Sequence, residues 1–361
     1  MRTLTLHEML KIAVDKNCSD LHLTVGVPPT LRYDGSLLPI EDCPALTPDD
    51  TRELCFFMLD DAQKKCVADN GEVDFSYSVY GLGRFRVNCY RQRHSYAAAI
   101  RIFRSSMPTI DGLGLPAVLK ELALKRRGLI IVTGATGTGK STTLAAMIDF
   151  INHNRRAHII TIEDPIEYLH AHNTCIINQR EVSADTVNFP GALRSALRED
   201  PDIILLGEMR DLETISTAIS AAETGHLVLS TLHTMDAPSA VERIIDMFAA
   251  QQQQQIRIQL ASSLQGIVSQ QLIKQKGALG RVAAFEVLLM TDAVRNQVRE
   301  AKTYQIVSTM QTGIKAGMMP MDYSLSELVI AGKITLEDAY LHCFEKDNLR
   351  HFLASRGNAP S

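Results

Sequence analysis

The chain has 361 residues, 45% of them hydrophobic, and a formal net charge of −4, which is typical of a globular protein long enough for two domains. It contains no apolar run of about 18 residues, so no membrane-spanning helix is expected, and its weak negative charge gives no general reason to bind nucleic acid. Charged side chains within residues 1–15 argue against a secretory signal. The seven cysteines are scattered without a Cys-x-x-Cys pair, which argues against zinc and favours a reduced cytoplasmic protein.

The first part of the chain mixes short alternating runs with helical segments. Apolar spacing predicts helices over 6–17 and 48–60. Alternation predicts strands over the following ranges: 21–25, 30–33, 74–79 and 84–90. This mixture indicates a small α+β domain over 1–104. The stretch 105–116 holds two prolines and two glycines, which punctuate a chain strongly, and we assign it as a linker.

A run of arginines precedes the linker. No Asp or Glu occurs from Phe75 to Ile110. Such a one-signed stretch can contact nucleic acid, or it can be an ordinary solvated sheet face. It can also supply a guanidinium to a γ-phosphate held by another subunit, stabilising charge in the transition state. The arginines of this stretch are Arg84, Arg86, Arg91, Arg93, Arg101 and Arg104.

After the linker, apolar runs alternate with helical segments. Such alternation predicts an α/β domain over 117–361, with a parallel sheet and helices on both faces. Ligands of these sheets bind at the carboxyl ends of the strands, so the polar residues that follow each run are the candidate site. The runs cover 128–133, 158–162, 202–206, 226–231 and 281–289.

A phosphate-binding loop follows the first of these runs. Residues 134–141 read Gly-Ala-Thr-Gly-Thr-Gly-Lys-Ser, in the strand-then-loop context that a P-loop requires. The glycines let the backbone fold around phosphates, towards which the N–H groups of the loop and of the next helix point. Lys140 can reach the β- and γ-phosphates, and Ser141 can offer its hydroxyl to Mg²⁺. The predicted nucleotide-binding residues are Gly134, Ala135, Thr136, Gly137, Thr138, Gly139, Lys140, Ser141 and Thr142.

Acidic residues and histidines follow the other runs. Glu163 is the candidate to orient or deprotonate the attacking water. Glu208 follows the next run, and its carboxylate together with Ser141 suits Mg²⁺. Both acids could instead be solvated strand ends. His226 opens the following strand, which favours a structural role, whereas His233 closes it at the nucleotide end, which favours phosphate sensing or positioning of a glutamate.

Two further helical segments give weaker indications of function. Arg194 and Arg198 are four residues apart, so on a helix they share one face. They could face the nucleotide or a neighbouring subunit, or they could pair with local acids. The run Gln251–Gln255 is expected to be a solvated helix surface.

Four ordered segments carry a resemblance to a known family. Together they resemble the Walker A, Asp box, Walker B and His box of secretion ATPases. Within that superfamily the chain is similar to the type IV pilus retraction ATPases, the PilT/PilU branch, over nearly its whole length, and the choice between the two remains open. In the stretch Ala293–Glu300 the polar Gln297 replaces an apolar residue of the family motif. The four segments are Gly134–Met147, Ile160–Glu167, Gly207–Asp211, and Thr224–His226 with Thr231–His233.

This resemblance implies a PAS-like N-terminal domain and a RecA-like ATPase domain with a C-terminal helical region. It also implies a homo-hexameric ring that binds ATP and Mg²⁺ between domains. Arg86 and Arg101 match arginines that reach the phosphates across that site. Glu163 matches the catalytic glutamate, Glu208 the Walker B glutamate and His233 the His box.

The implied activity is ATP hydrolysis coupled to type IV pilus retraction, and hence to twitching motility, at the cytoplasmic face of the inner membrane. Implied partners are an inner-membrane platform protein and a paralogous retraction ATPase. A pilus assembly or type II secretion ATPase is also possible, although such proteins usually carry a tetracysteine zinc insert that this sequence lacks. A nucleotide-dependent switch that does not turn over is possible as well, and so is a nucleic-acid motor, which only the arginine stretch supports.

Overall fold

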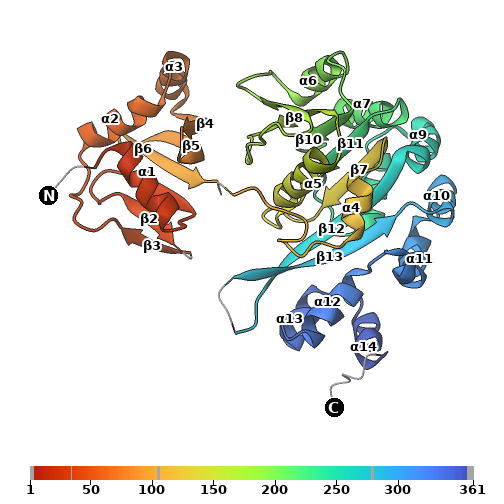
Figure 1. Cartoon of the computed structure of the whole chain (residues 1–361). Coiled ribbons are helices and arrows are strands. Elements are labelled where there is room, and N and C mark those ends of the chain that lie inside the picture. Colours follow the sequence, from red (N-terminus) through yellow and green to blue (C-terminus); the bar gives the residue numbers. More distant parts are fainter. Residues whose placement is uncertain (1–3, 34, 104–105, 278–279, 356–361) are drawn as a thin grey trace. The chain divides into compact units, whose positions relative to one another are not determined.

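The computed structural model describes residues 4–33, 35–103, 106–277 and 280–355, which divide into two compact units (Figure 1). The N-terminal unit comprises Met1–Met107 and Pro165–Leu169, and the C-terminal unit comprises Pro108–Asp164 and His170–Ser361. Arg104 and Ser105, where the predicted domain ends and the predicted linker begins, lie outside the described residues.

The rest of the predicted linker, from Pro108 onwards, belongs to the C-terminal unit. Ile110 and Leu115 are buried and pack in a core of that unit with Ile130 and Val132 of the predicted run 128–133. Prolines and glycines therefore mark turns here, because apolar side chains between them anchor the segment.

The N-terminal unit is built on an antiparallel sheet of six strands, in the order β3-β2-β1-β6-β5-β4. Successive side chains of a strand point to opposite faces. Phe85 and Val87 of β5 are fully buried in the core, whereas Arg86 between them is exposed. Helices cover the apolar face. The elements are α1 (Leu6–Asp15), β1 (Asp20–Leu23), β2 (Thr30–Tyr33), β3 (Ser36–Pro39), α2 (Pro48–Met58), α3 (Asp61–Asn70), β4 (Glu72–Val79), β5 (Gly83–Gln92) and β6 (Ser95–Ile102).

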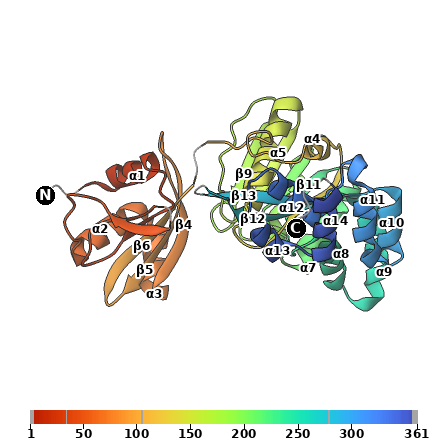
Figure 2. The same ribbon diagram turned by 90° about the horizontal axis from the view of Figure 1, so that it is seen from below.

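The C-terminal unit contains a seven-stranded sheet in the order β13-β12-β7-β11-β10-β8-β9. In Figure 2, α4 and α5 lie on one side of its strands, and α7 and α8 lie on the other. Six strands run parallel, and β13 pairs antiparallel with β12, so the run 281–289 is not the further parallel strand that was predicted. The central strands of the sheet are continuous apolar runs because helices cover both faces of the sheet. The α-helices and strands up to α11 are α4 (Val118–Ala123), β7 (Gly128–Thr133), α5 (Lys140–Asn154), β8 (His158–Glu163), β9 (Ile176–Glu181), α6 (Phe189–Ala196), β10 (Ile203–Leu206), α7 (Leu212–Glu223), β11 (Leu227–Thr231), α8 (Ala237–Asp246), α9 (Ala250–Ser263), β12 (Leu264–Lys274), β13 (Arg281–Leu289), α10 (Asp292–Arg299) and α11 (Ile306–Thr312).

Two hydrophobic cores lie on the two sides of this sheet. One contains residues of α4 and α5, and the other contains residues of α6 to α11. A smaller cluster joins β12 and β13 to the last three helices, α12 (Met321–Ile330), α13 (Leu336–His342) and α14 (Lys346–Ser355). Among the described residues no helix is both long enough and apolar enough to cross a membrane.

A buried carboxyl group lies where β13 meets two helices. Glu286 is 5% exposed, and its Oε1 accepts the N–H of Ala237, the first residue of α8, at 2.7 Å. Burial, together with the nearby carboxylates of Asp236 and Asp322, raises the pKa of Glu286 to about 8, although hydrogen bonds from the backbone oppose this shift. Near neutral pH the folded protein therefore holds this group protonated.

This group makes the stability depend on pH. A carboxyl whose pKa is raised on folding contributes stability that is complete below its ordinary pKa of 4.5 and is lost as the pH rises to about 8. Glu286→Gln is therefore expected to make the fall in unfolding free energy across this window shallower, by up to about 1.4 kcal/mol per pH unit. Urea denaturation of both proteins at pH 5.5, 6.5 and 7.5 measures the two slopes. Equal slopes would contradict the assignment.

Candidate active site

The P-loop leaves β7 and enters α5 through backbone conformations that favour glycine. Gly134, Gly137 and Gly139 have φ angles of 140°, 80° and 89°. A Cβ atom on Gly134 would lie 2.4 Å from the carbonyl oxygen of Gln270, so only glycine fits there. Gly139 caps α5, whose first residue is Lys140. The loop and the N-terminus of α5 therefore have the backbone geometry that a P-loop requires.

Lys140, His233 and Glu208 form a line across the ends of β7, β11 and β10. The Lys140 Nζ donates to the carbonyl oxygens of Gly134 and Ala135, at 2.9 and 3.0 Å, and lies 3.5 Å from the His233 Nδ1. The His233 Nε2 lies 3.2 Å from the Glu208 Oε2. Parallel strands bring their carboxyl ends to one edge of the sheet, which is why residues so far apart in sequence meet.

Glu163 closes β8 beside this line. The Gly207 N–H donates to the Ile162 carbonyl oxygen at 2.8 Å, so the loop that carries Glu208 starts beside Glu163. Two side chains that the sequence analysis did not single out contact its carboxylate: the Thr161 hydroxyl at 2.6 Å and the Gln179 amide at 3.1 Å.

Gln270 is a further residue that the sequence did not reveal. This buried side chain of β12 donates to the Thr138 carbonyl oxygen at 2.5 Å and accepts from the Thr143 hydroxyl at 2.9 Å. It therefore ties the P-loop to the first turn of α5. Its strand was not predicted, so no signal in the sequence could place it here.

The residues at this sheet edge suit a nucleotide with Mg²⁺. The loop is glycine-rich where its backbone packs closely, since a Cβ on Gly134 would collide with the Gln270 carbonyl oxygen, and the N-terminus of α5 that follows favours an anion. Ser141 is the second residue of α5, and the Glu208 side chain is 13% exposed at the end of the neighbouring strands. A hydroxyl and a carboxylate are oxygen ligands of the kind that Mg²⁺ prefers beside phosphate.

Arg86 and Arg101 lie directly opposite each other on β5 and β6 of the N-terminal unit. Arg86 pairs with Asp74 on β4, with its Nε 3.0 Å from the Oδ2, and Arg101 pairs with Asp20 on β1, with its Nε 3.2 Å from the Oδ1. These side chains occupy the face opposite the core and stay exposed, at 44% for Arg86 and 64% for Arg101, so both guanidinium groups remain accessible beside their acidic partners.

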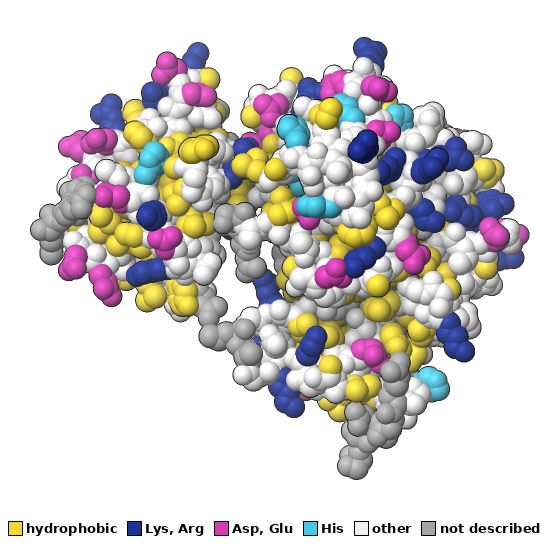
Figure 3. All heavy atoms as spheres, in the orientation of Figure 1, with side chains coloured by type: hydrophobic (Ala, Val, Ile, Leu, Met, Phe, Trp, Pro, Cys, Tyr) yellow, Lys and Arg dark blue, Asp and Glu magenta, His cyan; other side chains and the backbone are white. Residues whose placement is uncertain are grey.

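These ion pairs correct the expectation of a one-signed arginine patch. Asp74 and Asp20 lie outside the acid-free stretch in sequence, but they belong to the strands of the same sheet. Figure 3 shows acidic and basic side chains interspersed on the visible face of the N-terminal unit. The proposal of a nucleic-acid motor thus loses the observation that supported it.

Two more residues from the sequence analysis have structural partners. The His226 Nδ1 lies 3.0 Å from the Ala221 carbonyl oxygen, in agreement with a structural role. Arg194 forms an ion pair with Glu213 of α7. Helix α6 ends before Arg198, so the two arginines do not share a helix face as predicted.

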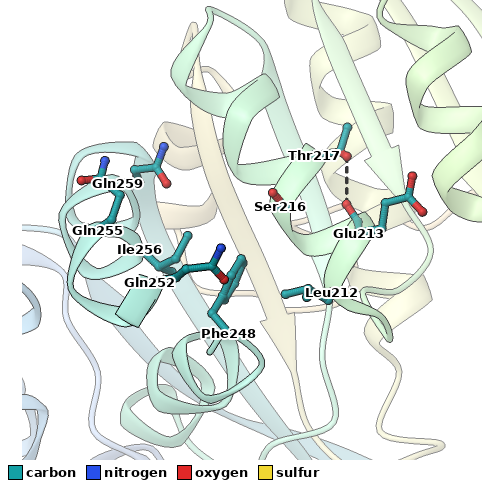
Figure 4. Close-up of a pocket in the computed structure, with 9 residues that line it drawn as sticks. All are labelled: Leu212, Glu213, Ser216, Thr217, Phe248, Gln252, Gln255, Ile256 and Gln259. Carbon is teal, nitrogen blue, oxygen red and sulfur yellow. Dashed lines mark hydrogen bonds between the residues drawn. The ribbon is translucent and has the colours of Figure 1, made fainter. Parts of the chain in front are cut away.

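A groove of about 550 Å³ lies between α7 and α9 (Figure 4). Phe248 and Ile256 form part of its wall, and Gln252 and Gln255 of the glutamine run line it. The glutamine run is mostly exposed, as expected. Two of its residues, Gln252 and Gln255, nevertheless face this concave surface. None of the predicted site residues lines this groove.

Comparisons with known proteins place the chain in a family. Residues 3–339 match the family model described as type II/IV secretion system protein. The type IV pilus retraction ATPase PilT of Pseudomonas aeruginosa is 48% identical over 332 residues, 92% of this chain and 96% of PilT. The type IV pilus ATPase PilU of the same organism is 43% identical over 343 residues, 95% of this chain and 90% of PilU.

Solved structures of related ATPases are also similar to this chain. A crystal structure of the pilus retraction motor PilT with bound ADP is 48% identical and superposes with a TM-score of 0.91, covering 96% of this chain and 99% of that one. The ATPase DotB of Legionella pneumophila is 26% identical, with a TM-score of 0.79, covering 94% of this chain and 96% of DotB. The chain belongs to the type II/IV secretion system protein family.

Proposed function

We propose that this chain is an ATP hydrolase that couples turnover to retraction of a type IV pilus. The observation that carries the proposal is the line of Lys140, His233 and Glu208 at the sheet edge, with Glu163 beside it. The similarity to a retraction motor that binds ADP supports the nucleotide as ligand and retraction as the activity.

Each part of the site has a role in phosphoryl transfer. The backbone of residues 134–142 would hold the phosphates, and Lys140 would move from the loop carbonyls to the β- and γ-phosphates. Ser141 and Glu208 would hold Mg²⁺, which neutralises charge on the phosphates. These groups already lie at one edge of the sheet, so they would have to reorient locally to meet the nucleotide but would not have to be brought together.

Glu163 would orient the attacking water and accept its proton. His233 lies between the lysine that contacts the phosphates and the glutamate that holds the metal. It is therefore placed to position Glu208 and to respond to the γ-phosphate through Lys140.

The two arginines of the N-terminal unit would act between copies of the chain. We propose a homo-hexameric ring in which Arg86 and Arg101 of one copy reach the phosphates held by its neighbour and stabilise the charge of the transition state. The ring would act at the cytoplasmic face of the inner membrane on a platform protein of the pilus machinery, and a paralogous retraction ATPase is a further candidate partner. Differential affinity of open and closed interfaces for ATP and ADP would then drive motion.

Replacement of the chromosomal copy by Lys140→Ala tests this function. The lysine contacts phosphates in every P-loop enzyme cycle, so the variant is expected to lose ATP binding and turnover. Cells are expected to carry abundant pili that extend and do not retract, as seen by fluorescence microscopy of labelled fibres. Cells without pili would instead identify an assembly ATPase, and retraction at the normal rate would contradict the proposal.

A further inference from the structure

The carboxylate of Glu163 is held by two neighbours that donate to the same oxygen. The Thr161 Oγ1 lies 2.6 Å from the Glu163 Oε1, and the Gln179 Nε2 lies 3.1 Å from it. Hydrogen bonds to an ionised acceptor are stronger than neutral ones. We infer that Gln179 and Thr161 are positioning residues that orient Glu163 towards the water that attacks ATP, an inference that rests on the proposed function.

The strand pairing explains how the three side chains meet. Thr161 and Glu163 are two residues apart on β8, so their side chains share one face of the sheet. Gln179 on β9 is the register partner of Thr161. Side chains of paired residues on one face lie next to each other, and a long side chain also reaches the residue two positions further along.

The backbone of His170 fixes the direction of the Gln179 amide. The His170 N–H lies 2.8 Å from the Gln179 Oε1, and because an N–H can only donate, this oxygen must be the acceptor. The NH₂ end of the amide therefore faces Glu163, and it can donate to a carboxylate. A flipped amide would lose the bond to His170 and place two oxygens together.

Two donors on one oxygen limit the rotation of the carboxylate. The terminal torsion of a glutamate is broad by itself, so a glutamate at a strand end samples many orientations. Thr161 is fully buried, and its hydroxyl cannot exchange Glu163 for water. The pair thus holds the carboxylate in one plane, and misplacement of a reacting group by about 1 Å can cost about a hundredfold in rate.

The test uses the purified full-length protein and steady-state phosphate release. Gln179→Met removes the amide and keeps the length of the side chain, and Thr161→Val removes the hydroxyl and keeps the branch. Each is expected to lower kcat about tenfold to a hundredfold, with the KM for ATP within about twofold of the wild type. Thr161→Ser retains the donor and is expected to retain most of the kcat.

Asn178 provides a matched control on the same strand. Its Oδ1 lies 2.9 Å from the His158 Nε2, so Asn178→Leu also removes a side-chain amide contact from β9, but at a residue whose contact is with His158. Wild-type kcat in this control, with a lowered kcat in Gln179→Met, is the expected result. An equal loss in both variants would indicate a general effect on β9 and would overturn the inference.

A double-mutant cycle separates this inference from the proposed function. In a Glu163→Gln background, Gln179→Met and Thr161→Val are expected to change the residual turnover by less than about twofold, because both act through the carboxylate. Full additive losses in that background would overturn the inference. If Glu163→Gln is inactive while the Gln179 and Thr161 variants keep the wild-type kcat, the inference alone is wrong. If Glu163→Gln itself turns over normally, the proposed catalytic role fails.

Discussion

Glu163→Gln is expected to bind ATP as the wild type does and to lose turnover by about 10²- to 10⁴-fold. The amide keeps the size of the side chain and the contacts of the P-loop, so the nucleotide is still held. It cannot accept a proton from water, so the chemical step is lost. Equilibrium binding of a fluorescent ATP analogue and steady-state phosphate release measure the two effects.

Glu223→Gln is the matched control for this variant. Glu223 ends α7 and contacts the Gln259 amide at 2.8 Å, away from the candidate site. The same chemical change there should leave turnover unaltered. Normal turnover of Glu163→Gln would remove this residue from the mechanism, and loss of ATP binding would assign it to the nucleotide pocket instead.

Arg101→Ala is expected to lower kcat by about 10³-fold or more while ATP binding changes little. A guanidinium that stabilises charge developing on the γ-phosphate acts in the transition state and not in the ground state. Arg86→Ala is expected to behave in the same way. Single-turnover hydrolysis by saturating enzyme separates this loss from a change in affinity.

Arg91→Ala serves as the control for the arginine variants. Arg91 is also exposed on β5, and the alternation of that strand places it on the opposite face from Arg86. Its loss should leave kcat unchanged. A loss of similar size in Arg91→Ala would indicate damage to the sheet, and normal turnover in Arg101→Ala would exclude this residue from the site.

The sequence predicted the fold best where burial and pattern agree. The run 128–133 coincides with β7, because a strand covered on both faces is a continuous apolar run. Strand β12 escaped prediction because it carries Ser269 and Gln270 in its middle, and a polar pair there resembles a loop. Both are buried, since the Ser269 hydroxyl contacts the Met235 carbonyl oxygen and Gln270 contacts the P-loop.

The candidate site, like the fold, was predictable from the sequence only in part. The P-loop and the residues after each strand are local signals, so Lys140 and Glu163 could be named from the sequence. Gln179 and Gln270 could not, because they lie on β9 and β12, strands that the pattern did not reveal.

The ion pairs were missed for a related reason. Counting charges along the chain placed Arg86 in an acid-free stretch, whereas the relevant neighbours are those across the sheet. Asp74 belongs to the adjacent strand β4 and reaches Arg86 from there. Register is a tertiary property, and a single sequence does not supply it.

Mixing two inactive variants tests most directly whether the active site combines residues of two copies. Lys140→Ala lacks the phosphate-binding lysine and keeps Arg101, whereas Arg101→Ala keeps the P-loop and lacks the arginine. If one copy supplies the arginine to its neighbour's nucleotide, mixed rings contain complete sites, and phosphate release should rise well above that of either variant alone. A mixture as inactive as its components would contradict the account.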